Sequence, residues 1–124
     1  MSRADQKLEQ IKRIVREVGL RLSKRGYFNE LVETTKWGQA AFLPDKPRVG
    51  TTVRVDLADD HHVALYVHCQ TNLVEMYKTV YPELRYEGNR AVWFPVNAKL
   101  PKQAVAFLAE AALMYHHNKT AVPR

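Results

Sequence analysis

The sequence predicts an α+β protein: a single-domain sandwich with an antiparallel sheet of about five strands, helices from the N- and C-termini packed on one face, and a short middle helix. Three observations support this fold class. Residues 3–25 and residues 101–117 each have the apolar spacing of a long helix, and the segments between them alternate and are joined by turns. Because the hairpins lie between the two long helices, we expect those helices to cover the same face of one sheet.

The first predicted element is an amphipathic helix. Ser2, with Asp5 three residues later, is a candidate capping box at its start, and Gly26 supplies a stop. An apolar residue recurs every three or four positions, and the resulting stripe consists of Leu8, Ile11, Val15, Val18 and Leu22. We therefore expect this stripe to lie on the sheet.

The net charge of +6 is concentrated in this helix. Residues 3–25 contain eight basic and three acidic side chains, whereas the rest of the chain contains eleven basic and ten acidic ones. The simplest interpretation is a solvated basic face opposite the apolar stripe. The alternative is a surface that binds nucleic acid or an acidic protein partner, and it predicts an affinity that falls steeply with salt.

The middle of the chain is predicted to form strands. Residues 27–44 are irregular, and Trp37-Gly38 indicates a bulge or a tight bend. After a loop that contains prolines, Thr51–Leu57 alternates as a half-exposed strand. The segment His62–Gln70 is apolar on both faces, so we expect it to be the middle strand, paired with Thr51–Leu57 through a turn at Asp59-Asp60.

The last third of the chain returns to helix after one more hairpin. Asn72 and Glu75 form a second candidate capping box for a short helix, and Gly88-Asn89 suits a two-residue hairpin turn. The final helix is apolar nearly all round. We expect it either to sit between the sheet and the first helix or to meet another subunit with its second face, so a homodimer is one alternative.

Length and composition narrow the class of protein. We assign all 124 residues to one domain, 1–124, with flexible tails at residues 1–3 and 120–124. No apolar run approaches the roughly 20 residues that a membrane helix needs, so we expect no membrane partner. The single cysteine, Cys69, cannot form an internal disulfide, and its place in the middle strand predicts a buried, reduced thiol. These features favour a cytoplasmic protein.

Polar side chains at the ends of several predicted elements form a candidate binding cleft. We expect Arg90 to hold an anionic group, the amides to orient it by hydrogen bonds and Trp37 to wall the pocket. The complete set is Trp37, Gln39, His68, Gln70, Asn89 and Arg90. Such a cleft suits a small anionic or polar ligand. In the structural alternative, the amides cap a helix or form a turn, and Arg90 pairs with Glu87.

The residue pattern gives little support for a metal site or for catalysis. The five histidines include two adjacent pairs whose rings diverge, while His68 and Cys69 are neighbours on a predicted strand and so face opposite ways. No phosphate-binding glycine loop, serine elbow or paired-carboxylate motif is present. We therefore predict a non-enzymatic protein with no catalytic residues, no metal ligands and no cofactor.

Several short motifs, taken in order, resemble the YdhG-like family of small bacterial domains of unknown function. They are Lys36–Phe42 (KWGQAAF), Ala64–Thr71 (ALYVHCQT), Leu84–Ala91 (LRYEGNRA) and an alanine-rich final helix that ends at Tyr115-His116. The resemblance runs from about residue 20 to residue 119. It implies a compact α+β domain similar in layout to frataxin. Some relatives are described as iron-handling chaperones, so the resemblance implies iron binding as an alternative function.

Overall fold

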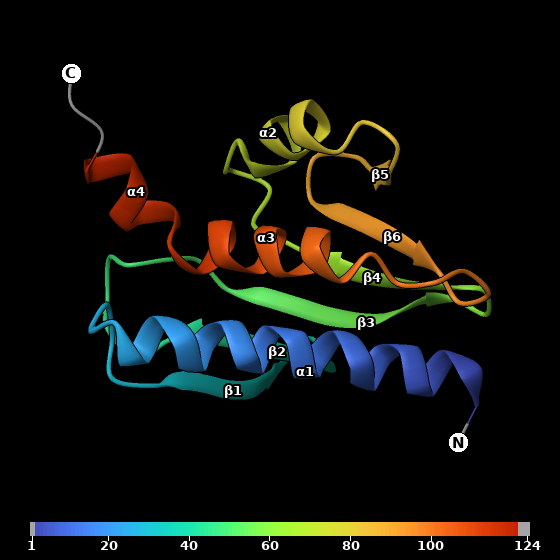
Figure 1. Ribbon diagram of the computed structural model, residues 1–124, viewed down its shortest axis with the longest axis horizontal. Helices are drawn as coiled ribbons and strands as arrows, with labels where there is room; N and C mark the ends of the chain where they lie inside the picture. Colours follow the sequence, from blue (N-terminus) through green and yellow to red (C-terminus); the bar gives the residue numbers. More distant parts are fainter. Residues whose placement is uncertain (1, 122–124) are drawn as a thin grey trace.

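The computed structural model describes residues 2–121 and has an α+β architecture with helices at both ends of the chain (Figure 1). In chain order the elements are α1 (Arg3–Lys24), β1 (Leu31–Lys36), β2 (Gln39–Pro44), β3 (Val53–Asp59), β4 (His62–Tyr66), α2 (Leu73–Val80), β5 (Arg85–Glu87), β6 (Ala91–Pro95), α3 (Lys102–Leu113) and α4 (Tyr115–Ala121). The predicted fold class and the single domain are confirmed.

Within the described residues the sheet has six strands in the order β1-β2-β3-β4-β6-β5, and neighbouring strands are antiparallel. The prediction that the segment from His62 forms an interior strand is confirmed, because β4 lies between β3 and β6. The predicted number of about five strands is one too few, since Trp37 and Gly38 form a hairpin turn between β1 and β2. Their φ angles of 57° and 75° are both positive, as in the two-residue turn that suits the twist of paired strands.

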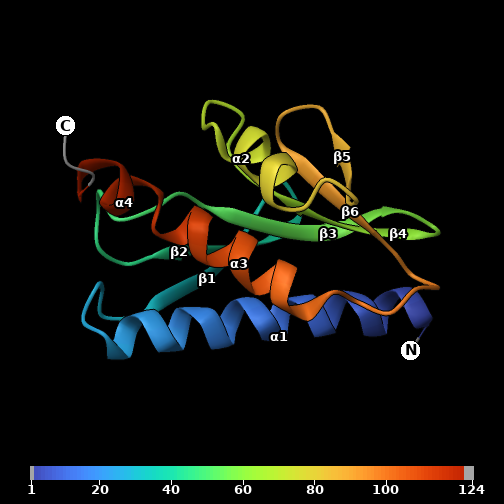
Figure 2. The ribbon, with the colours of Figure 1, turned by 45° about the horizontal axis from the view of Figure 1, so that its top comes forward.

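Helices α1 and α3 cover one face of the sheet, and Figure 2 shows both on the same side of β3 and β4. They run in the same direction, because Arg3 at the start of α1 donates to Asn97 just before α3, while Arg21 near the end of α1 pairs with Glu110 of α3. The predicted stripe of α1 is buried from Ile11 to Leu22. It packs with the inward side chains of the sheet, which include Phe42, Val53, Val55, Val63, Leu65, Val92 and Phe94.

The second apolar face of α3 packs against α2 of the same chain. Tyr77 of α2 is buried, and its hydroxyl donates to the backbone oxygen of Leu108 at 2.7 Å. The Phe107 ring lies 6.4 Å from the Tyr77 ring and 5.7 Å from the Tyr81 ring, measured between centroids. The two predicted alternatives for this face were the first helix and another subunit. In the structure, α1 and the sheet cover one side of α3, and α2 covers the other.

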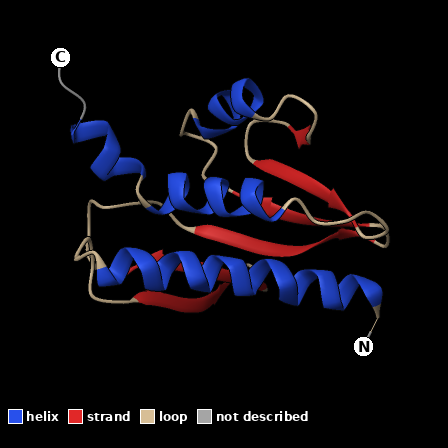
Figure 3. Cartoon of the chain, viewed as in Figure 1, coloured by secondary structure: helices blue, strands red, loops and turns tan. Residues whose placement is uncertain are grey.

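The predicted final helix is interrupted, and Figure 3 shows α3 and α4 as separate helices. The loop before β3 accounts for the interruption. Thr51 donates from both its backbone nitrogen and its hydroxyl to the carbonyl oxygen of Ala112, at 2.9 and 3.0 Å. His117 donates its backbone N–H to Val49 in the same loop. These contacts compete with helical hydrogen bonds, so the chain turns at Met114.

The helix caps were predicted with mixed success. The capping box at α1 is confirmed, because Ser2 Oγ accepts from the Asp5 N–H at 3.1 Å and the Asp5 carboxylate accepts from the Ser2 N–H. The second capping box is wrong, since the Asn72 side chain makes no capping hydrogen bond at α2. The hairpin between β5 and β6 also differs, because its loop contains Arg90 in addition to Gly88 and Asn89.

The ends of the chain are helical as far as the structure describes them. Arg3 begins α1, and residues 120 and 121 belong to α4. The remaining residues that were predicted to be flexible tails, residue 1 and residues 122–124, lie outside the described residues. Between residues 2 and 121, none of the helices has the length and apolar character required to cross a membrane.

Candidate anion-binding site

The sheet face opposite α1 and α3, here called the outer face, carries aromatic rings that lie under arginines. Its members on β3 to β6 include Arg54, Asp56, Ala64, Tyr66, Arg85 and Trp93. The guanidinium carbon of Arg54 is 5.4 Å from the Tyr66 ring centroid, and that of Arg85 is 4.4 Å from the Trp93 ring. The aliphatic stems of such side chains cover apolar surface while the charged groups stay at the surface.

Arg54 is held in place by two neighbours. Besides stacking on Tyr66, it donates from one guanidinium nitrogen to Gln39 Oε1 at 2.9 Å. Gln39 begins β2, and Arg54 lies on β3, which pairs with β2. This arrangement fixes the orientation of a half-buried guanidinium before any ligand arrives.

The chain leaves the sheet earlier than the sequence predicts. β4 ends at Tyr66, after which Val67 donates its N–H to the Arg90 carbonyl at 2.8 Å. Thr71 then donates from its N–H and its hydroxyl to the His68 carbonyl, at 3.1 and 2.7 Å. This local turn replaces the last strand residues because short polar side chains compete with sheet hydrogen bonds. As a result Cys69 is exposed, and the expectation of a buried thiol is wrong.

A cavity of about 280 Å³ lies where these segments meet, and we call it the basic pocket. Its cations come from three parts of the sheet: Lys36 ends β1, Arg54 lies on β3, and Arg90 belongs to the loop between β5 and β6. The complete lining is Lys36, Trp37, Thr52, Arg54, Val67, His68, Cys69 and Arg90. No carboxylate is among these lining residues, so the pocket is positively charged.

The pKa of the neighbouring Tyr66 is raised overall, although two cations of the basic pocket oppose the shift. Burial raises the pKa of Tyr66, and the carboxylate of Asp56 raises it further, whereas Arg54 and Arg90 lower it. Both arginines are therefore close enough to influence a group on the outer face. Within residues 2–121, the side chains of Lys36 and Arg90 make no hydrogen bond or ion pair, which leaves their donors available to a ligand.

His68 can contribute a hydrogen-bond donor to the pocket. Its Nδ1 accepts from the backbone N–H of Gln70 at 3.1 Å. A neutral imidazole that accepts at Nδ1 carries its hydrogen at Nε2. The exposed His68 ring therefore adds an N–H group to the three cations of the basic pocket.

The structure brings together only part of the predicted cleft. Trp37, His68 and Arg90 line the basic pocket, and Gln39 contacts it through Arg54. Gln70 and Asn89 instead line a separate cavity of about 370 Å³, beside α2 and α4. The segment around Cys69 separates the two cavities, and Asn89 supports that segment by donating from its side chain to the Cys69 carbonyl at 3.0 Å.

The alternative interpretation gave two residues local roles only: an ion pair with Glu87 for Arg90, and a place in the turn for Asn89. Arg90 does not pair with Glu87, whose carboxylate binds Arg85 at 2.8 Å. The role of Asn89 extends beyond its turn, since it holds the loop that follows β4. Arg90 is therefore directed to the basic pocket rather than used within its own hairpin.

Two residues of the basic pocket, Arg54 and Lys36, are absent from the predicted cleft. A signal for Arg54 was present in the alternation of Thr51–Leu57, which places Arg54 on the exposed face of its strand. Pairing this strand with the next one through the short turn at residues 60–61 puts Arg54 opposite Tyr66. Alternation alone does not show that Arg54 lies near His68 and Arg90. The register of the strands is needed as well.

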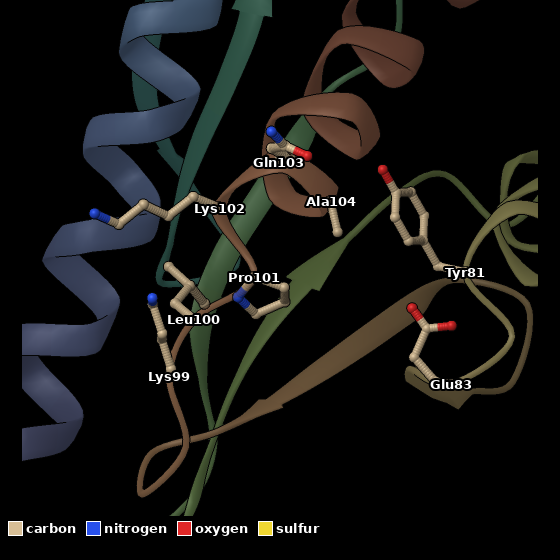
Figure 4. Close-up of a pocket in the computed structure, with 8 residues that line it drawn as sticks. All are labelled: Tyr81, Glu83, Lys99, Leu100, Pro101, Lys102, Gln103 and Ala104. Carbon is tan, nitrogen blue, oxygen red and sulfur yellow. The ribbon is translucent and has the colours of Figure 1, made fainter.

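A third cavity, of about 500 Å³, lies between the start of α3 and the segment after α2 (Figure 4). Its lining includes Tyr81, Glu83, Pro101 and Ala104. Lys99 and Lys102 also line it, and Figure 4 shows Lys102 extending away from Tyr81 and Glu83, toward α1. Because its lining contains the carboxylate of Glu83, this cavity offers less to an anion than the basic pocket, whose lining has no carboxylate.

The sequence also raised a metal site and a binding surface on the basic helix α1, and the described residues support neither of them. Residues 2–121 contain no group of three or more His, Cys, Asp or Glu side chains arranged to hold a metal ion. Several cations of α1 are engaged by carboxylates nearby, in the pairs Lys12–Glu9, Arg16–Glu33 and Arg21–Glu110.

Comparison with known proteins gives no family for this chain. Its sequence matches no protein-family model, and neither curated proteins nor solved structures gave a significant match. Conclusions about function therefore depend on the geometry and charge of the site itself.

Proposed function

We propose that this protein is a non-enzymatic binding or accessory domain that holds a small anionic ligand in the basic pocket. The observation that supports it is the convergence of Lys36, Arg54 and Arg90 from three separate parts of the sheet around one cavity whose lining contains no carboxylate. Bringing like charges together is unfavourable unless a counter-charge is bound, so the arrangement suits an anion.

Each side chain has a distinct role in this proposal. Arg54, fixed by Gln39 and Tyr66, presents a planar guanidinium for two parallel hydrogen bonds to a phosphate or carboxylate. Arg90 and Lys36 close around the anion from the other walls, and His68 donates from Nε2. The pocket thus combines one fixed guanidinium with two cations whose side chains make no hydrogen bond or ion pair among the described residues.

We also propose a cytoplasmic location, supported by a single cysteine that cannot form an internal disulfide.

The resemblance to the YdhG-like family stays a prediction. Iron binding, which that resemblance implies, receives no support from the donor groups in the described part of the chain. Binding of nucleic acid or an acidic protein through α1 is likewise not favoured, since carboxylates already pair with several of its cations.

The proposal is tested by calorimetric titration of the whole chain with pyrophosphate. We expect binding that weakens as salt is added, and about tenfold or greater loss of affinity in Arg90→Gln and in Arg54→Gln, because each removes a charge-assisted hydrogen bond. Arg13→Gln is the matched control, since it removes the same charge from the exposed side of α1. Absence of pyrophosphate binding, or an equal loss in Arg13→Gln, would contradict the proposal.

A further inference from the structure

Trp37 is placed in a way that the fold alone does not explain. Its side chain is 89% exposed, so the indole adds almost nothing to the core. Its φ of 57° is unfavourable for a bulky residue, and turns of this kind usually have asparagine, aspartate or glycine at that position. The chain therefore keeps a large aromatic side chain at a hairpin tip where a small polar residue would suit the backbone better.

The position of Trp37 beside the basic pocket suggests a use for it. The residue before it, Lys36, supplies one of the pocket's cations, and the indole lines the same cavity. The pairing of Lys36 with Gln39 closes the turn, and Gln39 in turn holds Arg54. One hairpin thus positions a cation, the anchor of a second cation and an exposed aromatic ring.

We propose that the basic pocket, if it binds anions as proposed above, is a nucleotide site in which Trp37 stacks on the base while Lys36, Arg54 and Arg90 hold the phosphates. A ligand with phosphate at one end and a flat ring at the other matches both features. A cavity of about 280 Å³ is at the lower limit of typical small-molecule sites, so the phosphates fill it and the base remains at its mouth, where the indole is exposed.

The charge of the remaining outer face favours a single nucleotide over a long single strand. Away from the pocket, Asp56 and Glu87 share that face, and Arg85 is already paired with Glu87. A continuous phosphate backbone crossing the sheet would meet these carboxylates. Lys36, Arg54 and Arg90, which line the basic pocket, have no carboxylate partner among the described residues.

The test compares ADP with pyrophosphate by calorimetry on the whole chain. We expect ADP to bind about tenfold more tightly than pyrophosphate, because the base adds a stacking contact. Trp37→Ala should reduce the ADP affinity to that of pyrophosphate and leave the pyrophosphate affinity unchanged, whereas Trp37→Phe should keep most of the ADP preference. Leu20→Ala is the control, because it removes an exposed apolar side chain from α1.

Fluorescence gives an independent measurement. The chain has two tryptophans, so Trp93→Phe leaves Trp37 as the only one, and ADP should quench its emission while pyrophosphate should not. The calorimetric comparison does not require this variant, so a folding defect in Trp93→Phe leaves the test intact.

The outcomes separate this inference from the proposed function. Equal affinities for pyrophosphate and ADP, with no effect of Trp37→Ala, would overturn the nucleotide site and leave the anion site standing. Failure of both ligands to bind would overturn both. A single-stranded oligonucleotide that binds far more tightly than ADP, and loses affinity in Trp37→Ala, would replace the nucleotide with a nucleic-acid strand.

Discussion

At the scale of single residues, charged side chains of this protein connect elements that are distant in sequence. Arg16 of α1 binds both carboxylate oxygens of Glu33 on β1, at 2.6 and 2.9 Å. The two side chains are 45% and 43% exposed, so water screens the pair and its contribution to stability is small. The hydrogen bond from Arg16 is the main reason that the pKa of Glu33 is lowered, and burial opposes it.

Glu33→Gln should change how stability depends on pH. Since the pKa of Glu33 is lower in the folded state, its stabilisation is fully present above the unfolded value near 4.5 and is lost as pH falls through the folded value. We expect the wild type to be more stable than the variant by at most about 1 kcal/mol at neutral pH, and the difference to vanish in acid.

Urea denaturation at several pH values measures this difference. Glu30→Gln, which removes a carboxylate just before β1 and outside the Arg16 pair, serves as the control. A stability difference between the wild type and Glu33→Gln that stays constant from neutral to acidic pH would show that the ion pair is not its source.

At the scale of elements, the loop between β2 and β3 determines where the last long helix ends. Gly50 lies against the end of α3, and a Cβ built on it would be 1.8 Å from the Leu113 carbonyl oxygen. Next to it, Thr51 takes the Ala112 carbonyl as its acceptor. Glycine is needed here for close approach of two backbones rather than for an unusual φ angle.

Gly50→Ala should therefore destabilise the protein. The added methyl group meets backbone atoms, which cannot move aside as a flexible side chain can, and overpacking of this kind costs about 1–3 kcal/mol. The free energy of unfolding from urea titration measures the effect. Gly26→Asn is the comparison, because the space around Gly26 is open, so the only strain there comes from the positive φ of 85°, which asparagine adopts more readily than most residues. A Gly50→Ala variant as stable as Gly26→Asn would contradict this packing.

At the scale of the whole molecule, the protein is a two-layer structure whose helices cover one face of a sheet and leave the outer face to arginines and aromatic rings. Large exposed apolar side chains in the described part of the chain are spread over several elements rather than gathered on one. They are Leu20, Val32, Trp37, Leu57, Val80 and Phe107.

We therefore expect the protein to be a monomer. A stable dimer commonly buries about 800 Å² on each partner, and the second apolar face of α3, which could have supplied such a surface, is packed against α2. Sedimentation velocity over a wide range of protein concentration should give one species near 14.3 kDa. A sedimentation coefficient that rises with concentration would show self-association instead.

Helix spacing and strand alternation predicted most of the helices and strands, because both patterns are set by residues close together in the sequence. The spacing of Ile11, Val15 and Val18 determined which side of α1 is buried, and the apolar segment from His62 predicted an interior strand, in which Val63 and Leu65 are fully buried. The same reasoning failed at Cys69, where hydrogen bonds between His68 and Thr71 end the strand pattern before the cysteine.

The sequence by itself determined that α1, β3 and β4 form, that β4 begins at His62, and that Trp37, His68 and Arg90 stand at the ends of elements. Only the tertiary structure decided that these three share a pocket with Arg54 and Lys36, while Gln70 and Asn89 line another. The physical reason is that periodicity fixes the direction of a side chain relative to its own element. Strand register and the path of the loops fix which elements meet, and both depend on contacts between residues far apart in the chain.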